Sequence, residues 1–197
     1  MSKLRDLKKN LKPGHVYRTA ELAAWSNAVD RHAKALVNDG TLKKLKQGMY
    51  YYPKQSVFGA VPPDEEELVE TFLKDDHFLL TSPNDYNSLG VGTTQLYNKR
   101  VVYNHKRHGD FKLGGRVFSF HVKPRFPSKV TEEFLLVDLV NHLERLAEDQ
   151  NVVLQNVAKK VETMEPKKLK KALMEYGGAR AKSFLTPLLQ KQASHAH

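Results

Sequence analysis

Residues 18–53 read RTAELAAWSNAVDRHAKALVNDGTLKKLKQGMYYYP, and this stretch determines the expected fold of the N-terminal part of the chain. One set of apolar side chains recurs at helical spacing and predicts a helix with a single buried face: Val29, Ala33, Leu36 and Val37. A shorter helix precedes it, and the hydroxyls of Thr19 and Ser26 are the expected N-caps of the two helices. Gly40 is expected to end the second helix, because glycine adopts left-handed backbone at little cost.

A basic hairpin is expected after the second helix. Its strands are predicted at residues 41–45 and 49–52, with a turn at residues 46–48 and Pro53 at its end. Two helices joined by a turn and followed by such a hairpin are the plan of a winged helix-turn-helix. In that plan the second helix enters the DNA major groove and the hairpin touches phosphate. A winged helix that mediates protein contacts is the alternative.

The side chains expected to bind DNA are polar or basic and lie on the two helices, between them or on the hairpin: Arg18, Thr19, Ser26, Asn27, Arg31, Lys34, Asn38, Lys43, Lys44, Lys46 and Gln47. Asn27 and Arg31 stand near the start of the second helix, the end that usually reaches base edges. Arginine is suited to guanine and asparagine to adenine, because both pairs make two parallel hydrogen bonds. The hairpin lysines are expected on phosphates instead.

The net charge of +10 is distributed unevenly along the 197 residues. Residues 1–60 contain 12 Lys and Arg against 4 Asp and Glu, and residues 151–197 contain 9 against 3. Residues 61–150 are mildly acidic, with 11 Lys and Arg against 15 Asp and Glu. Basic ends attract a polyanion such as nucleic acid, and salt weakens that attraction steeply. Ordinary solvated surface is the alternative for both ends.

Val61-Pro62-Pro63 marks the expected boundary between a winged-helix domain, residues 1–60, and a second domain, residues 61–197. The further elements expected from periodicity and turn signals are helices at 3–11, 64–74, 131–149, 151–164, 167–176 and 181–189, a helix starting at Ser82-Pro83, strands at 78–80 and 100–103, and a hairpin of 111–113 with 116–122. The expected fold class is α+β: an N-terminal winged helix-turn-helix, then a small, mainly antiparallel sheet with helices, and a C-terminal helical bundle.

Two segments of the chain resemble AbiEi-type antitoxins, the transcriptional autoregulators of type IV toxin–antitoxin systems. The first comprises YRTAELA and DRHAKALVNDGTLKKLKQGMYYYP, and the second comprises NSLGVGTTQL, RVVY and FKLGGRVFSFHVKP. Together they lie within residues 17–126. The resemblance implies a repressor of its own promoter whose second domain counters a nucleotidyltransferase toxin, directly or indirectly. We expect two copies to bind double-stranded DNA at an operator with inverted repeats, because one winged domain covers little DNA.

No catalytic or metal-binding motif is found in the sequence. His105 and His108 are flanked by Lys106 and Arg107, whose charges disfavour a cation. Residues 165–167 have the Glu-x-Lys spacing of some nucleases, but they lie at a helix break rather than on a strand. The chain is therefore expected to be no enzyme and to use no cofactor or metal. A nucleic-acid-processing enzyme docked by the winged helix is one alternative, and a ligand-sensing regulator with a pocket in its sheet is another.

A basic cluster lies on the predicted helix 167–176 and consists of Lys167, Lys168, Lys170 and Lys171. We expect it to meet an acidic partner surface or the nucleic-acid substrate of the toxin, and a solvated face is the alternative. The sequence contains no cysteine and no run of 18 apolar residues, and its first residues contain no apolar signal segment. A cytoplasmic protein without membrane contact is therefore expected.

Overall fold

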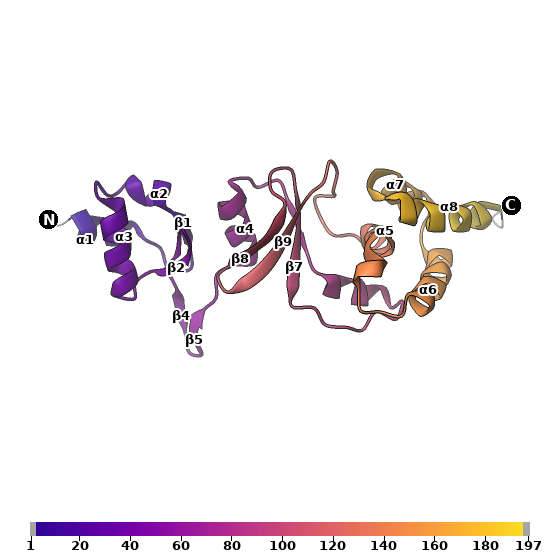
Figure 1. Ribbon diagram of the computed structural model, residues 1–197, viewed down its shortest axis with the longest axis horizontal. Helices are drawn as coiled ribbons and strands as arrows, with labels where there is room; N and C mark the ends of the chain where they lie inside the picture. The colour runs from indigo at the N-terminus through magenta and orange to yellow at the C-terminus, as the bar shows by residue number, and fades with distance from the viewer. Residues whose placement is uncertain (1–2, 195–197) are drawn as a thin grey trace. The chain divides into compact units, whose positions relative to one another are not determined.

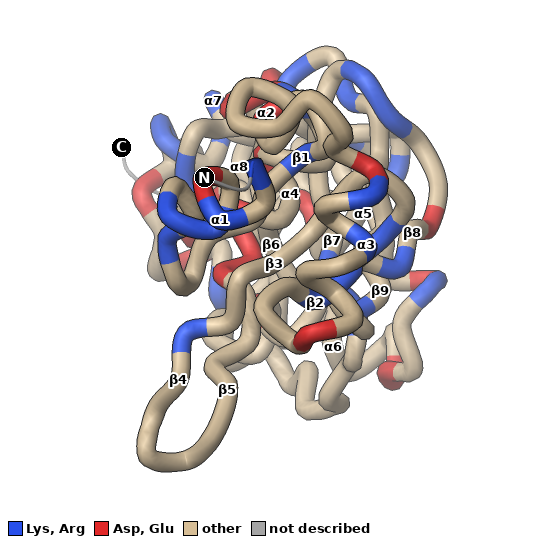
Figure 2. The backbone as a smooth tube through the Cα atoms, turned by 90° about the vertical axis from the view of Figure 1, so that its left-hand side faces the viewer, with Lys and Arg blue, Asp and Glu red and all other residues tan. Residues whose placement is uncertain are grey.

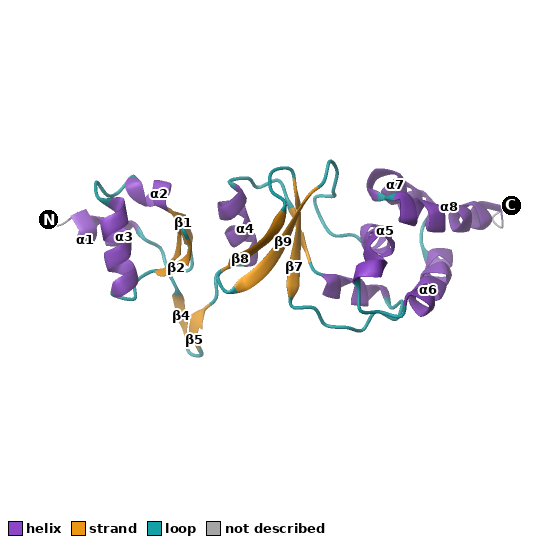
Figure 3. Ribbon diagram, in the orientation of Figure 1, coloured by secondary structure: helices purple, strands orange, loops and turns teal. Residues whose placement is uncertain are grey.

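The computed structural model describes residues 3–194 and is an α+β protein with small antiparallel sheets and several helices (Figures 1 and 3). Its helices are α1 (Lys3–Asn10), α2 (Thr19–Ala23), α3 (Val29–Asn38), α4 (Glu65–Leu73), η1 (Pro83–Leu89), α5 (Glu132–His142), η2 (Leu143–Arg145), α6 (Gln150–Thr163), α7 (Pro166–Tyr176) and α8 (Ala179–Ser194). Its strands are β1 (Val16–Arg18), β2 (Lys43–Lys46), β3 (Met49–Tyr51), β4 (Lys54–Ser56), β5 (Gly59–Val61), β6 (Leu79–Thr81), β7 (Lys99–Asn104), β8 (Gly109–Leu113) and β9 (Arg116–Val122). Among these helices, none combines the length and the apolar character that crossing a bilayer requires.

The chain divides into two compact units. Unit 1 comprises residues 1–76 and 109–118, and unit 2 comprises residues 77–108 and 119–197. A four-stranded sheet is ordered β6-β7-β9-β8, and the division falls within β9. The compact units therefore do not follow the boundary expected after residue 60, and a functional division at that boundary stays a prediction.

The first elements of unit 1 enclose a small core. β3 is the central strand of an antiparallel sheet ordered β1-β3-β2, in which Tyr50 pairs with Tyr17 on one side and Lys44 on the other. The buried side chains come from both the helices and the sheet: Leu7, Leu11, Tyr17, Leu22, Ala33, Leu36, Leu42 and Tyr50. Burial of this apolar surface holds α1, α2 and α3 against one another and against the sheet.

Both expected helix caps in this region are wrong. α2 begins at Thr19 itself, and the carboxylate of Glu21 accepts the backbone N–H of Arg18 at 2.7 Å. α3 begins later than expected, with Ala28 at its N-cap. The hydroxyl of Ser26 accepts the N–H of Ala28 at 3.1 Å and forms a hydrogen bond of 2.7 Å with buried His32. A buried imidazole needs a hydrogen-bond partner, and Ser26 provides it for His32 instead of capping the first turn of the helix.

α4 packs against β1 within unit 1. The carboxylate of Asp64 accepts the N–H of Glu67 and caps the helix. Glu67 in turn accepts the N–H of Val16 at 2.9 Å and lies 3.2 Å from His15 Nδ1. Arg116, at the start of β9, forms an ion pair with Glu65. These polar contacts fix the helix on the edge of the sheet.

The β4–β5 hairpin was not predicted. Its tip carries Val57 and Phe58, whose exposed fractions are 93% and 98%. The hydroxyl of Ser56 closes the turn by accepting the N–H of Phe58 and donating to the carbonyl of Gly59. The segment between Pro53 and residues 61–63 is too short to show the alternating pattern by which a strand is recognised in a sequence.

In unit 2, α7, α8 and η1 pack against α5, and α6 packs against α8. Leu136, Leu139 and Val140 of α5 are fully buried. α5 ends at His142 rather than at residue 149, because Leu146 adopts extended backbone after η2 and Asp149 caps the next helix. α8 continues to Ser194, beyond the expected end at residue 189. The helix expected at Ser82-Pro83 is confirmed as η1, with the Ser82 side chain as its cap.

Candidate nucleic-acid interface and partner surface

The exposed side of α3 and the turn before it carry four of the eleven residues that were predicted to bind DNA: Asn27 in the turn, and Arg31, Lys34 and Asn38 on the helix. Successive helical residues are about 100° apart, so these positions share one side of the helix. The opposite side carries Ala33 and Leu36, which are fully buried. Figure 2 shows basic positions in α3 and in α1 of the same unit. The helix therefore presents a polar, basic face about three turns long.

The end of α3 is fixed by Asp39. Its carboxylate accepts the backbone N–H of Thr41 at 2.9 Å and lies 3.5 Å from Nζ of Lys8 in α1. The hydrogen bond from Thr41, followed by the charge of Lys8, lowers the pKa of the Asp39 carboxyl. The ionised side chain thus sets the direction in which the chain leaves α3 and enters β2.

The β2–β3 hairpin presents two exposed lysines, Lys43 and Lys44. Nζ of Lys44 donates a hydrogen bond of 2.8 Å to the side-chain carbonyl of Gln47, which lies in the turn. The turn itself contacts the start of α2, because the N–H of Thr19 donates to the carbonyl of Gly48 at 3.1 Å. The hairpin is therefore short and held close to the two helices.

Lys46 does not extend outward as the sequence analysis expected. Its Nζ lies 4.7 Å from the ring centroid of Phe72 and 4.5 Å from that of Phe111. The two rings belong to α4 and β8, and their centroids are 5.0 Å apart. A cation over two aromatic faces is stabilised by their quadrupoles, so Lys46 anchors the hairpin to the rest of unit 1.

Ser26 is also an unsuitable DNA ligand, because its hydroxyl is 9% exposed and already bonded within the fold. Arg18 and Thr19 are half-buried where β1 joins α2. Of the predicted set, the exposed members are Asn27, Arg31, Lys34, Asn38, Lys43, Lys44 and Gln47. The structure thus brings together a smaller set than the sequence suggested.

The four lysines at the start of α7 differ in their contacts. Lys168 forms an ion pair of 2.7 Å with Glu165, and the hydrogen bond and charge of Glu165 raise the pKa of Lys168. Lys167 and Lys170 line a groove between α7 and α8, and together with Lys171 they also line a neighbouring hollow. Three lysines of the predicted cluster therefore share one hollow, whereas the charge of Lys168 is paired with Glu165.

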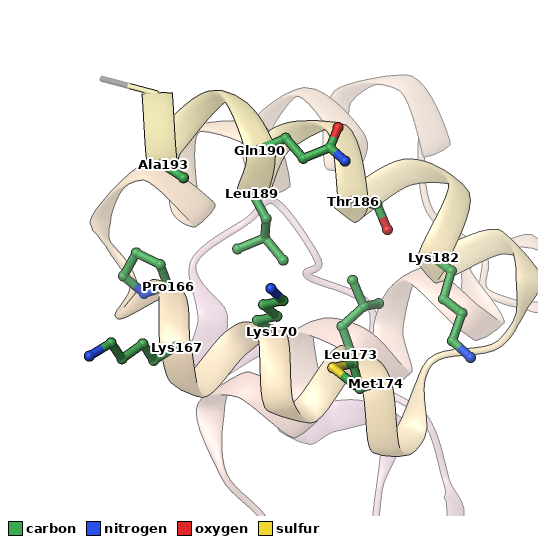
Figure 4. Close-up of a pocket in the computed structure, with 10 residues that line it drawn as sticks. All are labelled: Pro166, Lys167, Lys170, Leu173, Met174, Lys182, Thr186, Leu189, Gln190 and Ala193. Carbon is green, nitrogen blue, oxygen red and sulfur yellow. The ribbon is translucent and has the colours of Figure 1, made fainter. Parts of the chain in front are cut away.

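The α7–α8 groove has a volume of about 490 Å³. Leu173 from α7 and Leu189 from α8 point toward each other across it, and Lys167 and Lys182 lie toward its two ends (Figure 4). Met174 is 69% exposed beside this floor. The lining residues labelled in Figure 4, all between residues 166 and 193, include no Asp or Glu. The groove therefore has an apolar floor and a rim whose charged side chains are all lysines.

Unit 2 also buries an ionisable cluster that the sequence analysis missed. The Asp138 carboxylate accepts hydrogen bonds from the hydroxyls of Tyr86 at 2.6 Å and Tyr103 at 2.8 Å, and it lies 3.3 Å from Nδ1 of His142. Asp138 is 4% exposed. Burial, followed by the charge of Asp138, raises the pKa of both tyrosines, which therefore remain donors. Nδ1 of His142 must carry a proton, because its two partners, Oδ1 and the carbonyl of Asp138, only accept.

His105 and His108 contact different aromatic partners. The ring of His105 stacks on His77 at 4.9 Å and lies 4.8 Å from Phe126. His108 meets the ring of His121 edge-on at 5.5 Å. The two imidazoles therefore contribute to separate aromatic contacts in unit 2.

A model of a protein family described as a family of unknown function, DUF6088, matches residues 3–174. The chain belongs to this family. Among solved structures, this DUF6088 chain is similar to the crystal structure of the RV2827C protein from Mycobacterium tuberculosis, with a TM-score of 0.61. The sequences are 14% identical, and the similarity covers 96% of this chain and 75% of that chain, so it shows the fold alone. No curated protein matches the DUF6088 chain.

The residues that match the DUF6088 model include α3, the β2–β3 hairpin and Asp138, and the match ends within α7. The α8 wall of the groove, from Lys182 to Ala193, lies beyond the matched residues. The structural similarity extends over nearly the whole DUF6088 chain.

Proposed function

We propose that the chain is an AbiEi-type antitoxin of a type IV toxin–antitoxin system and a DNA-binding repressor of its own promoter. The observation that carries the proposal is the exposed basic face of α3 followed by a lysine-bearing hairpin. The element order α1-β1-α2-α3-β2-β3 and the strand order β1-β3-β2 support a winged helix-turn-helix. The resemblance in the segments between residues 17 and 126 supports the assignment to toxin–antitoxin systems.

In this proposal α3 is the recognition helix. An α-helix with its side chains is about 10–12 Å wide and fits the major groove of B-DNA. Asn27 and Arg31 reach base edges, while Lys34, Lys43 and Lys44 neutralise phosphates. One such helix reads one half-site, so two copies bind an inverted repeat.

Replacing Arg31 by alanine is expected to weaken binding to the promoter of the chain's own gene by about 1–3 kcal/mol and to relax its specificity. The matched variant Lys44→Ala should weaken promoter and scrambled DNA equally, because a phosphate contact carries no sequence information. Fluorescence anisotropy titrations on both duplexes at one salt concentration measure the two effects. An equal loss on both duplexes for Arg31→Ala would exclude a base contact by this residue.

The second part of the proposal concerns the toxin, and the α7–α8 groove supports a direct contact with it. A groove with an apolar floor suits an amphipathic helix of a partner, whose apolar side chains fill the groove at helical spacing. The lysines at its rim favour a partner helix with Asp or Glu beside those apolar residues. A second copy of the same face is disfavoured, because it would bring lysines against lysines.

Replacing Lys170 by glutamate is expected to abolish rescue of cells that express the neighbouring nucleotidyltransferase toxin, while promoter binding is retained. The charge reversal places a carboxylate on the groove and repels an acidic partner. Lys168→Gln is the matched control, because Lys168 pairs with Glu165 outside the groove. Growth assays measure rescue, and titrations with promoter DNA measure binding. Both use the intact chain, because α4 packs against β1 and a fragment starting at residue 61 would lose that contact. Full rescue by Lys170→Glu would remove the groove from the proposal.

The ligand-sensing alternative is favoured by one observation, a small pocket beside β7 and β9 in unit 2. It concerns a different site from the groove, and both can operate in one chain. The enzyme alternative gains no comparable support.

A further inference from the structure

A pocket of about 170 Å³ lies in unit 2 between β7, β9, η1 and the end of α5. The polar side chains that line it include Tyr86, Lys99, Tyr103, His121, His142 and Arg145. They come from segments far apart in the sequence. This volume equals that of about five or six water molecules, enough for a small anionic group with a short carbon skeleton.

The carboxylate behind the pocket wall is already satisfied. Asp138 accepts from the hydroxyls of Tyr86 and Tyr103, and His142 lies within 3.3 Å of it. A carboxylate with these partners is poorly placed to attract a cation into the pocket, because its lone pairs face donors of the protein itself. The two tyrosines are in turn held in fixed positions and form a rigid wall.

The remaining charged groups at the pocket are cationic or can become so. Lys99 and Arg145 line it together with His121 and His142. Burial lowers the pKa of His121, and the charges of His108, His142, Lys123 and Lys99 lower it further. The part of this effect that comes from the neighbouring charges, as distinct from burial, indicates positive potential at this point.

We propose that this pocket binds a phosphomonoester, with Arg145 and Lys99 holding its dianionic oxygens and His121 contacting a third. The planar guanidinium fork matches two phosphoryl oxygens, and a lysine ammonium complements them as a point charge. Two cations attract a dianionic phosphoryl group more strongly than a monoanionic carboxylate. The assignment does not depend on DNA binding or on a toxin.

The test uses the full chain and inorganic phosphate, monitored by NMR of the imidazole signals. Adding phosphate at constant ionic strength is expected to shift the His121 and His142 signals to saturation and to raise the pKa of His121, since a bound dianion stabilises imidazolium. Arg145→Gln should weaken binding roughly tenfold or more, because charged hydrogen bonds are lost. Arg125→Gln is the matched control, because Arg125 lines a different hollow beside α7.

Further arms identify the source of the phosphoryl group. Tighter binding of ribose 5-phosphate than of inorganic phosphate indicates a free phosphorylated metabolite. Tighter binding of a 5′-phosphorylated oligonucleotide than of its 5′-hydroxyl form indicates a nucleic-acid end. The proposal is overturned if 20 mM phosphate leaves both imidazoles unchanged, if acetate produces the same shifts, or if Arg145→Gln folds, as shown by its melting curve, and binds phosphate like the parent chain.

Discussion

Raising the salt concentration from 50 to 200 mM is expected to weaken binding of the chain to duplex DNA by about 500-fold. The exposed cations of α3 and the β2–β3 hairpin, together with the basic residues of α1, allow about five phosphate contacts. Each contact releases condensed counterions, so the logarithm of the binding constant falls with that of the salt concentration at a slope of about −4.5. Anisotropy titrations at four or five salt concentrations measure this slope.

Two lysine variants distinguish an exposed lysine of the hairpin from Lys46, which packs on aromatic rings. Lys44→Gln should make the slope shallower by about one, because one phosphate contact is lost. Lys46→Gln should leave the slope unchanged, because its ammonium lies over the rings of Phe72 and Phe111. A slope near zero for the parent chain would refute DNA binding through this face.

Replacing Asp138 by alanine is expected to lower the free energy of unfolding by about 3–5 kcal/mol. The change leaves the hydroxyls of Tyr86 and Tyr103 and the N–H of His142 without their shared acceptor inside unit 2. Each unsatisfied buried donor costs about 1–3 kcal/mol, although partial rearrangement makes the sum less than additive. Urea unfolding followed by far-ultraviolet circular dichroism measures the loss.

Asp138→Asn is the matched control for that substitution. Its amide retains one acceptor and nearly the same shape, so a loss of only about 1–2 kcal/mol is expected. Trp25, the single tryptophan, lies in unit 1 and reports whether that unit unfolds in the same transition. If the free energy of unfolding of Asp138→Ala lies within 1 kcal/mol of that of the parent chain, the hydrogen-bonded cluster does not stabilise unit 2.

The features that the sequence predicts correctly are those that depend on apolar periodicity and on local turn residues. The buried face of α3 follows from apolar residues at helical spacing, and the β8–β9 turn follows from Gly114-Gly115 between apolar strands. The expected end of α3, at Gly40, lies two residues beyond the last helical residue, Asn38. These features are decided by residues that are neighbours along the chain, so a single sequence contains the signal for them.

The features that were missed depend on contacts that local sequence patterns do not reveal. Ser26 was expected to cap α3 because nothing local reveals that His32 is buried beside it. Lys46 was expected to reach DNA because its ring partners, Phe72 and Phe111, lie on later elements. Asp138 sits in an apolar helix, and that placement is its only local signal, since its donors are on η1 and β7.

The position of Lys46 has an entropic consequence for recognition. A hairpin whose central side chain is tied to two rings, and whose turn is bonded to Thr19, samples few conformations before DNA arrives. The loss of conformational freedom is then incurred during folding rather than during association. If the proposed DNA binding holds, Lys43 and Lys44 would meet the phosphates from a preorganised strand, and loosening this anchor would lower affinity without removing a single contact to DNA.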